Sequence, residues 1–222
     1  MALILHIDTS MDSASVCLSR DESMISIAQN HSQKDHASWL HTTIEKMMQE
    51  QQLPFSNLDA VAVSIGPGSY TGLRVGLSSA KGFCYALNIP LITIGTLEMM
   101  ANAARQPGEL LFCPMIDARR MEVYTALFDA NLKAILPPTA MILDASSLSE
   151  FLNKYQIVFF GNGYKKFKSI ISHPNAIFED VEITASSMIQ LANNKFLLKS
   201  FSDLAYTVPL YLKDFYSSSQ IK

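Results

Sequence analysis

A Gly-Pro-Gly turn between an apolar run and a helical segment constrains the fold of this chain more than any other stretch. Residues 60–65 are apolar, the turn occupies 66–68, and helical spacing runs from 69 to 87. The proline stiffens the turn, and its glycines allow close approach of another backbone. Ser69 or Thr71 is suited to cap the helix. The stretch predicts a strand, a tight turn and a helix in succession.

The turn does not match either of the common nucleotide-binding loops. A Walker loop needs Lys and then Ser or Thr after its last glycine, but Leu73 and Arg74 follow Gly72. A dinucleotide fingerprint needs a third glycine at position 71, which is Thr71. Phosphate binding of these two kinds is therefore not expected.

Small residues recur at every fourth position of the helical segment, at Gly72, Gly76, Ala80 and Cys84. Such a ridge lets another element approach the helix closely. The approaching element can belong to this chain or to a second protein, and the spacing alone leaves both alternatives open.

The composition of the 222 residues is that of a globular protein, with 49% hydrophobic and 17% charged residues. A net charge of −3 argues against a protein that grips nucleic acid on its own. The one basic cluster, Lys165, Lys166 and Lys168, is interpreted as a solvated helix face. One large or two small domains would suit this length.

Three scattered cysteines, Cys17, Cys84 and Cys113, lie in apolar runs and are expected to be reduced core thiols. The first residues lack the charged region of a signal peptide, and no apolar run reaches the ~18 residues of a membrane span. We therefore expect a soluble cytoplasmic protein without a membrane partner.

Hydrophobic periodicity places the elements along the chain. The first half predicts strands at 3–8, 14–18, 24–29, 60–65 and 91–94, and helices at 35–51, 69–87 and 96–104, with Asp35 and Thr96 as caps. The second half predicts strands at 110–116, 122–128, 140–143, 157–160 and 176–178, helices at 146–155, 164–171 and 184–198, and a helical start to 203–215. This order predicts an α/β fold of mixed sheets. No internal repeat is visible.

The run Gly66-Pro67-Gly68-Ser69-Tyr70-Thr71-Gly72-Leu73-Arg74-Val75-Gly76, followed by Ala80-Lys81-Gly82, resembles the signature of the TsaB (YeaZ-type) family. A second run resembles the same family through Asp117, Arg119, Glu122 and Tyr124. A third, Pro209 to Lys213, resembles the family's Pro-x-Tyr-Leu-Arg ending, with Lys213 in place of Arg.

The resemblance implies an actin-like (ribonuclease H-like) fold. An N-terminal lobe, 1–105, carries a mixed sheet with helices on both faces, and 106–222 forms a shortened second lobe of the same type. Residues from about 203 to 222 are expected to pack back on the first lobe. Active actin-like enzymes contact phosphate with an Asp-x-Gly turn after strand one. Here the turn is Asp8-Thr9-Ser10, and the missing glycine weakens cofactor binding by these three residues.

The resemblance also implies a scaffold rather than an enzyme. TsaB-type proteins are the non-catalytic partners of a TsaD-type catalytic subunit in making threonylcarbamoyladenosine beside the anticodon of tRNAs. The TsaD-type metal histidines have no counterpart at 96–102, so neither a catalytic residue nor a metal site is expected. The scattered histidines support this, since His36 and His41 lie roughly 140° apart on a helix.

In the family, the first two helices of this lobe pack against the equivalent pair of the partner. The implied interface residues are His36, Leu40, Ile44, Gly68, Ser69, Tyr70, Gly72, Leu73, Arg74, Gly76, Ala80 and Lys81. Gly76→Leu is then expected to abolish the complex and leave the chain soluble. A TsaE-type ATPase is the second implied partner, tRNA is contacted only indirectly, and the chain alone can form a homodimer.

No intrinsic cofactor is expected, although ATP or ADP at the partner interface stays open. The alternative to the scaffold is a stand-alone enzyme, either a glycoprotease-like peptidase or a small actin-like phosphotransferase. The missing glycine after Asp8, the missing metal histidines and the short second half count against that alternative.

Overall fold

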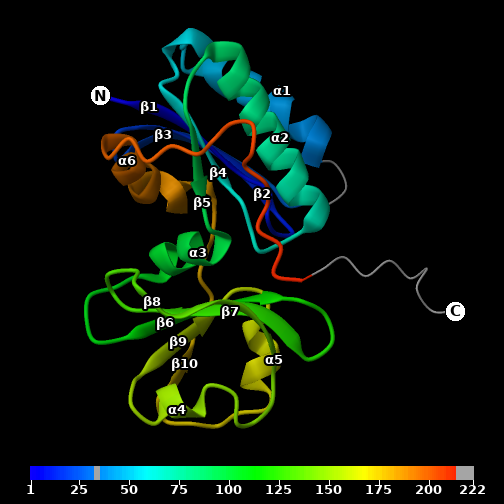
Figure 1. Cartoon of the computed structure of the whole chain (residues 1–222), viewed down its shortest axis with the longest axis vertical. Helices are drawn as coiled ribbons and strands as arrows, with labels where there is room; N and C mark the ends of the chain where they lie inside the picture. The colour runs from blue at the N-terminus through cyan, green and yellow to red at the C-terminus, as the bar shows by residue number, and fades with distance from the viewer. Residues whose placement is uncertain (33–35, 214–222) are drawn as a thin grey trace, which may run out of the picture.

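The structure, a computed structural model, describes residues 1–32 and 36–213, except for the side chain of His36. Two lobes are stacked along the long axis of the molecule, and each is built on a five-stranded mixed sheet (Figure 1). This architecture confirms the predicted α/β class.

The first sheet has the strand order β3-β2-β1-β4-β5. An antiparallel meander, β1 to β3, is extended by β4 and β5 in parallel. Its strands are β1 (Leu3–Asp8), β2 (Ala14–Arg20), β3 (Ser23–Asn30), β4 (Ala60–Ser64) and β5 (Leu91–Ile94), with a short 3-10 turn η1 (Phe55–Asn57) before β4. All five predicted strands of this half are confirmed.

Both faces of the first sheet are covered by other elements. Side chains of a strand alternate between the two faces of its sheet, so neighbouring residues of β1 belong to different cores. Leu5 and Ile7 of β1 face the core under α1 (His36–Glu50) and α2 (Tyr70–Leu87). Ile4 faces the opposite core, under the C-terminal elements η2 (Ala185–Met188) and α6 (Ile189–Leu197).

The second sheet, β10-β9-β6-β7-β8, has the same topology as the first. β6 to β8 form the antiparallel meander, and β9 and β10 add in parallel. Its strands are β6 (Leu111–Asp117), β7 (Glu122–Phe128), β8 (Ala134–Ile142), β9 (Ile157–Phe160) and β10 (Ala176–Phe178). The two lobes are therefore structural repeats, although their sequences show no repeat.

The shortening of the second lobe lies in its helices, not in its sheet. α4 (Ser149–Leu152) and α5 (Tyr164–Lys168) are each shorter than the predicted helices at 146–155 and 164–171. β8 is longer than the predicted strand at 140–143, because Pro137 and Pro138 are tolerated in an edge strand.

α3 (Thr96–Ala104) lies between the lobes (Figure 1). Its residues Leu97, Met100 and Ala101 pack into the core on one face of the second sheet. Thr96 is not the helix cap that the sequence predicted. Gly95 holds that position, and the Thr96 hydroxyl accepts a hydrogen bond from the Gly66 amide at 3.1 Å.

The chain returns to the first lobe earlier than predicted. η2 and α6 pack on the first sheet, so the return begins near Ile183 and not at about 203. The predicted helix at 184–198 is split by the 3-10 turn η2, which Thr184 and Ser187 cap. The predicted helical start at 203–215 is wrong, because the chain forms only a turn at 204–206 and is otherwise irregular to residue 213.

We call residues 203–213 the strap, because they run from α6 along α2 toward the second lobe (Figure 1). Just before it, Ser202 bridges to Leu91 at the edge strand β5. Within the described ranges, no helix is both long and apolar enough to cross a membrane.

Candidate functional site

The Gly-Pro-Gly turn joins β4 to α2 and packs against the loop that follows β1. The Ser69 amide donates to the Ser10 carbonyl at 2.7 Å, and the Ser69 hydroxyl caps α2 by accepting from the Gly72 amide. A Cβ at Gly68 would lie 2.2 Å from the Ser10 carbonyl oxygen. The glycine is therefore required by this close approach of two backbones.

The small-residue ridge of α2 faces the interior of its own lobe. A Cβ at Gly72 would lie 1.9 Å from the Thr9 carbonyl oxygen, and one at Gly76 would lie 2.3 Å from Thr9 Oγ1. Thr9 Oγ1 also donates to the Gly72 carbonyl at 2.7 Å, and Ala80 is fully buried. Of the two alternatives left open by the spacing, the structure supports packing within the chain.

This placement corrects part of the predicted interface. The residues Leu40, Ile44, Gly72, Leu73, Gly76 and Ala80 are buried in the first lobe, where they hold α1 and α2 on the sheet. Gly76→Leu would disturb the fold itself, so it cannot serve as the test of an interface. His36 begins α1, but its side chain lies outside the described residues.

The exposed side of α2 is a different stripe of the same helix. Thr71, Arg74, Ser78, Gly82 and Tyr85 are exposed at helical spacing, and Tyr85 is 83% exposed. Of the other predicted interface residues, Ser69 is exposed, while Gly68, Tyr70 and Lys81 are half-buried. Lys81 donates to the Ala205 carbonyl of the strap.

A groove of about 410 Å³ lies between α1 and α2 on the outer surface. His41 of α1 contacts Ser79 of α2 at 3.0 Å, and its ring lies 5.8 Å from that of Phe83. Gly82 leaves the groove open, since a Cβ there would meet nothing within 4 Å. The lining is completed by Ser78 and Ala86.

The turn after β1 is occupied by internal hydrogen bonds. Asp8 Oδ1 accepts from the Ser10 amide, the Ser10 hydroxyl and the Ser64 hydroxyl, all within 3.0 Å. Asp8 and Thr9 are each 1% exposed. Asp8 Oδ1 therefore links β1, its loop and β4.

A cleft of about 750 Å³ opens between the lobes at the N-terminal ends of α1 and α2. Three residues of the predicted second-lobe motif, Asp117, Arg119 and Tyr124, lie in its wall, whereas Asp8 does not. The rest of the lining is Ser10, Met11, Asp12, Ala37, Gly68, Ser69, Tyr70, Thr71, Gly72, Val75, Ile116, Ala118 and Asn162.

The motif residues of the second lobe shape the β6–β7 hairpin. Burial alone would raise the pKa of the Asp117 carboxyl, but hydrogen bonds from Lys166 Nζ at 2.6 Å and from the Arg119 amide outweigh it and lower the pKa. Glu122 forms an ion pair with Lys213 at the end of the strap. The hairpin acids are thus engaged by lysines from other segments.

The strap contains the third motif run, Pro209 to Lys213, and contacts the other two runs. Sequence reasoning treated the three runs separately. The Leu210 amide donates to the Ile65 carbonyl at 2.7 Å, beside the Gly-Pro-Gly turn. The ring of Tyr211 lies 5.2 Å from that of Tyr70, and Lys213 reaches Glu122. The likeness of Pro209 to Lys213 to a family ending was the only sequence signal for this role.

The three cysteines are free, buried thiols. Burial raises the pKa of Cys17 and Cys113 to about 12 and that of Cys84 to about 11, so the thiols stay protonated near neutral pH. The prediction of reduced core thiols agrees with this placement. Within the described residues, no group of three or more His, Cys, Asp or Glu side chains could hold a metal ion.

The relatives of this chain give a consistent picture. Residues 26–216 match the model of the family described as TsaD, tRNA N6-adenosine threonylcarbamoyltransferase. The tRNA threonylcarbamoyladenosine biosynthesis protein TsaB of Bacillus subtilis is 31% identical over 63% of this chain and 62% of its own length. The TsaB of Escherichia coli is 25% identical over 95% of this chain and 94% of its own length.

A solved structure from Pseudomonas aeruginosa, named as an uncharacterized protein with similarity to peptidase YEAZ, has a similar fold. It superposes with a TM-score of 0.84 over 96% of this chain and all of its own, at 22% identity. From the family match, the named relatives and this fold, the chain belongs to the TsaD family of tRNA N6-adenosine threonylcarbamoyltransferases, as a member of its TsaB (YeaZ) type.

Proposed function

We propose that this chain is a non-catalytic subunit in the formation of threonylcarbamoyladenosine on tRNA. It acts by docking on a TsaD-type catalytic subunit through the exposed sides of α1 and α2. The observation that carries the proposal is the open groove between these helices, lined by His41, Gly82 and Phe83 among others. The named function of the Bacillus subtilis and Escherichia coli relatives supports it.

The groove is suited to receive a helix from a partner. α1 and α2 are long, and their inner sides are fully engaged with the first sheet, so their orientation is rigid. At Gly82 the α2 backbone is accessible, and a partner helix can approach it closely. The half-buried ring of Phe83 supplies apolar area beside it.

The non-catalytic part of the proposal is supported by the loop after β1. Asp8 has its Oδ1 engaged by Ser10 and Ser64, and Thr9 is used to seat α2. An active site would need such groups to face a substrate. Here these groups form hydrogen bonds that hold the elements of the first lobe together.

The residues around the interlobe cleft include few groups that bind phosphate. Phosphate binding needs cations or free backbone amides, and Arg119 is the only Lys or Arg among the described lining residues. Of the backbone amides in its wall, that of Ser69 donates to the Ser10 carbonyl and that of Gly72 to the Ser69 hydroxyl. We propose that any ATP or ADP bound at the interface requires groups from the partner. Calorimetry with the complex, and with this chain alone, tests that requirement.

The remaining components follow from the family's function. A TsaE-type ATPase is proposed as the third protein, and the assembly is proposed to work in the cytoplasm. A homodimer through the same groove is the alternative use of this face when the partner is absent. Sedimentation over a range of concentrations, with and without the partner, distinguishes the two assemblies.

The decisive experiment combines co-purification with reconstitution. A Cβ at Gly82 would meet nothing within 4 Å, so Gly82→Trp directs its side chain into the groove; we expect it to abolish co-purification with the catalytic subunit and to leave folding intact. Lys154→Trp, at an exposed position of the second lobe, is the matched control. If tRNA modification proceeds equally well without this chain, the proposed function is wrong.

The stand-alone enzyme remains the competing function. Because the Pseudomonas aeruginosa structure carries a peptidase-like name, peptidase activity deserves a direct assay. Proteolysis or ATP turnover by the purified chain that survives Asp8→Asn would exclude a role of Asp8 in that activity. Activity lost with Asp8→Asn, in a variant that stays folded, would favour the enzyme over the scaffold.

A further inference from the structure

The tip of the β6–β7 hairpin carries two adjacent arginines, Arg119 and Arg120. Both are exposed, and both adopt positive φ angles, 68° and 47°. Such backbone angles are unfavourable for residues other than glycine, asparagine or aspartate. In the described part of the chain, neither guanidinium has an ion pair or a side-chain hydrogen bond. Their charges are thus presented to the solvent.

The acids nearest to the tip are already neutralised. Asp117 pairs with Lys166 of α5, and Glu122 pairs with Lys213 of the strap. Each pair brings an ammonium group to the base of the hairpin, where Arg119 also has a Coulombic interaction with Asp117. Asp12 lines the interlobe cleft together with Arg119, and its Oδ2 accepts a hydrogen bond from Asn162 at 3.4 Å. The hairpin therefore has an excess of positive charge, although the whole chain carries −3.

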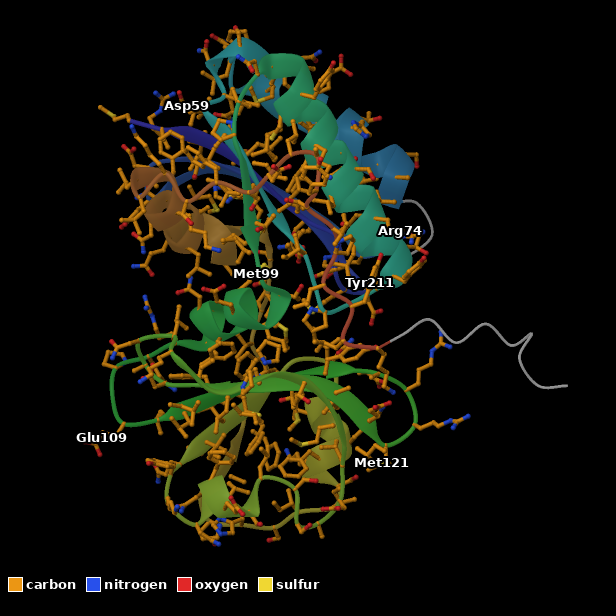
Figure 2. All side chains as sticks on the ribbon, in the orientation of Figure 1. Asp59, Arg74, Met99, Glu109, Met121 and Tyr211 are labelled. Atoms are coloured by element: carbon orange, nitrogen blue, oxygen red, sulfur yellow. The ribbon has the colours of Figure 1, made fainter. Side chains whose placement is uncertain are left out.

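The tip lies at the end of the proposed docking face. Arg119 lines the same cleft as Ala37 and Thr71, which belong to the first turns of α1 and α2. Met121, beside the arginines, lies on the same side of the molecule as Arg74 and Tyr211 (Figure 2). A large ligand held by a partner on α1 and α2 could therefore reach the hairpin.

We propose that Arg119 and Arg120 contact the phosphate backbone of tRNA in the assembled complex. The inference rests on the proposed function and changes one expectation, since the sequence predicted only indirect contact with tRNA. Two exposed arginines on a convex turn match the requirements of phosphate contacts, which need charge and reach but no deep pocket. The two arginines supply this charge at the tip, although the whole chain carries −3.

An acidic protein surface is the other polyanion that could bind here. Phosphate contacts tolerate Lys in place of Arg, because a point charge satisfies them, whereas a bidentate pairing with carboxylates does not. Binding to RNA also depends on salt in a characteristic way. The logarithm of the affinity falls with the logarithm of the salt concentration, and each lost phosphate contact makes this slope shallower by about 0.7 to 0.9.

The experiment measures binding of an unmodified tRNA transcript by the reconstituted complex over a series of salt concentrations, using fluorescence anisotropy. The double variant Arg119→Gln with Arg120→Gln removes the charges. The pair Arg119→Gly with Arg120→Gly removes them and also relieves the positive φ angles, which guards against misfolding. Arg20→Gln with Lys154→Gln, both exposed and distant from the hairpin in the sequence, is the control of equal net charge.

We expect the Gln and Gly pairs to weaken tRNA binding roughly tenfold and to lower the salt slope by about 1 to 2, while the control pair and a Lys pair at 119 and 120 change little. An unchanged affinity and slope would overturn the proposal. Loss of the protein partner, with tRNA binding by the remaining complex unaltered, would instead assign the tip to an acidic protein surface. Failure of the unsubstituted chain to join any complex would refute the proposed function itself.

Discussion

Arg74 of α2 donates a hydrogen bond from Nε to the hydroxyl of Tyr211 at 3.1 Å, and so joins residues 137 positions apart (Figure 2). The Arg74 guanidinium also lies 4.1 Å from the centre of the Tyr70 ring, which packs against the ring of Tyr211. The start of α2 and the strap therefore form one cluster. Two motif runs that are remote in sequence have a shared task, which is to fix the strap on the first lobe.

Tyr211→Ala is expected to release the strap. The change removes a ring–ring contact and a hydrogen bond at a residue that is 41% exposed, so we expect a loss of about 1 kcal/mol in the free energy of unfolding. Tyr211→Phe keeps the ring and should lose less. Urea denaturation and limited proteolysis of the strap measure both effects. Tyr206→Ala, 84% exposed in the same strap, is the control, and equal losses at 206 and 211 would contradict the prediction.

The glycines of α2 should respond to alanine in opposite directions. Gly76→Ala places a Cβ 2.3 Å from Thr9 Oγ1 and is expected to destabilise the fold by more than 1 kcal/mol. Gly82→Ala meets nothing within 4 Å and should stabilise the helix by up to about 1 kcal/mol. Chemical denaturation of the two variants provides the comparison. A stabilising Gly76→Ala would show that the Thr9 loop yields easily and that the ridge is not tightly packed.

Buried His6 should make stability depend on pH. Burial lowers the pKa of His6 from 6.5 to about 3, and its Nε2 contacts the Ser19 hydroxyl at 2.8 Å. Between these pH values the unfolded chain binds a proton that the folded chain rejects. Stability is therefore full above pH 6.5 and falls as the pH decreases toward 3, by up to ~1.4 kcal/mol per unit.

Urea unfolding at a series of pH values tests this effect, and the range above the titration of ordinary carboxylates is the informative one. His6→Gln retains a group able to hydrogen bond with Ser19 but does not titrate. Its stability should be lower at neutral pH and less dependent on pH. An identical pH dependence in both proteins would assign the effect to other groups.

The ion pair of Lys213 with Glu122 should add little stability, and that little should depend on salt. The side chains are 41% and 16% exposed, so a double-mutant cycle with Gln at each position is expected to give a coupling of about 0.5 to 1 kcal/mol at low salt. Lys213→Arg, which restores the residue of the family ending, should retain the coupling. A coupling of zero at low salt would show that the strap is held by Tyr211 and Leu210 alone.

Much of the first lobe was predictable because local signals agree there. Its strands are short apolar runs, and its helices have a clear period, so the bounds of α2 and β5 agree with prediction within a residue. The second lobe was harder. Its helices are too short to show a period, and Pro137 and Pro138 hide an edge strand from a propensity argument.

The candidate site, too, was predictable from the sequence only in part. The sequence located the turn, the ridge and the family motifs, but the ridge spacing is equally suited to contact inside the chain and outside it. The Thr9 carbonyl and hydroxyl, which lie against Gly72 and Gly76, decide between these alternatives. Such a contact joins distant residues, so no local pattern contains it.

By itself, the sequence determined the α/β class, the Gly-Pro-Gly turn with its capped helix, and the family, because these depend on periodicity and on residues that are close in the chain. Only the tertiary structure decided which side of α2 faces outward and where the strap binds. It also decided that Asp117 and Glu122 form ion pairs with lysines, and that Arg119 and Arg120 are exposed. These features depend on which distant segments meet when the two lobes pack, and packing is a property of the whole chain.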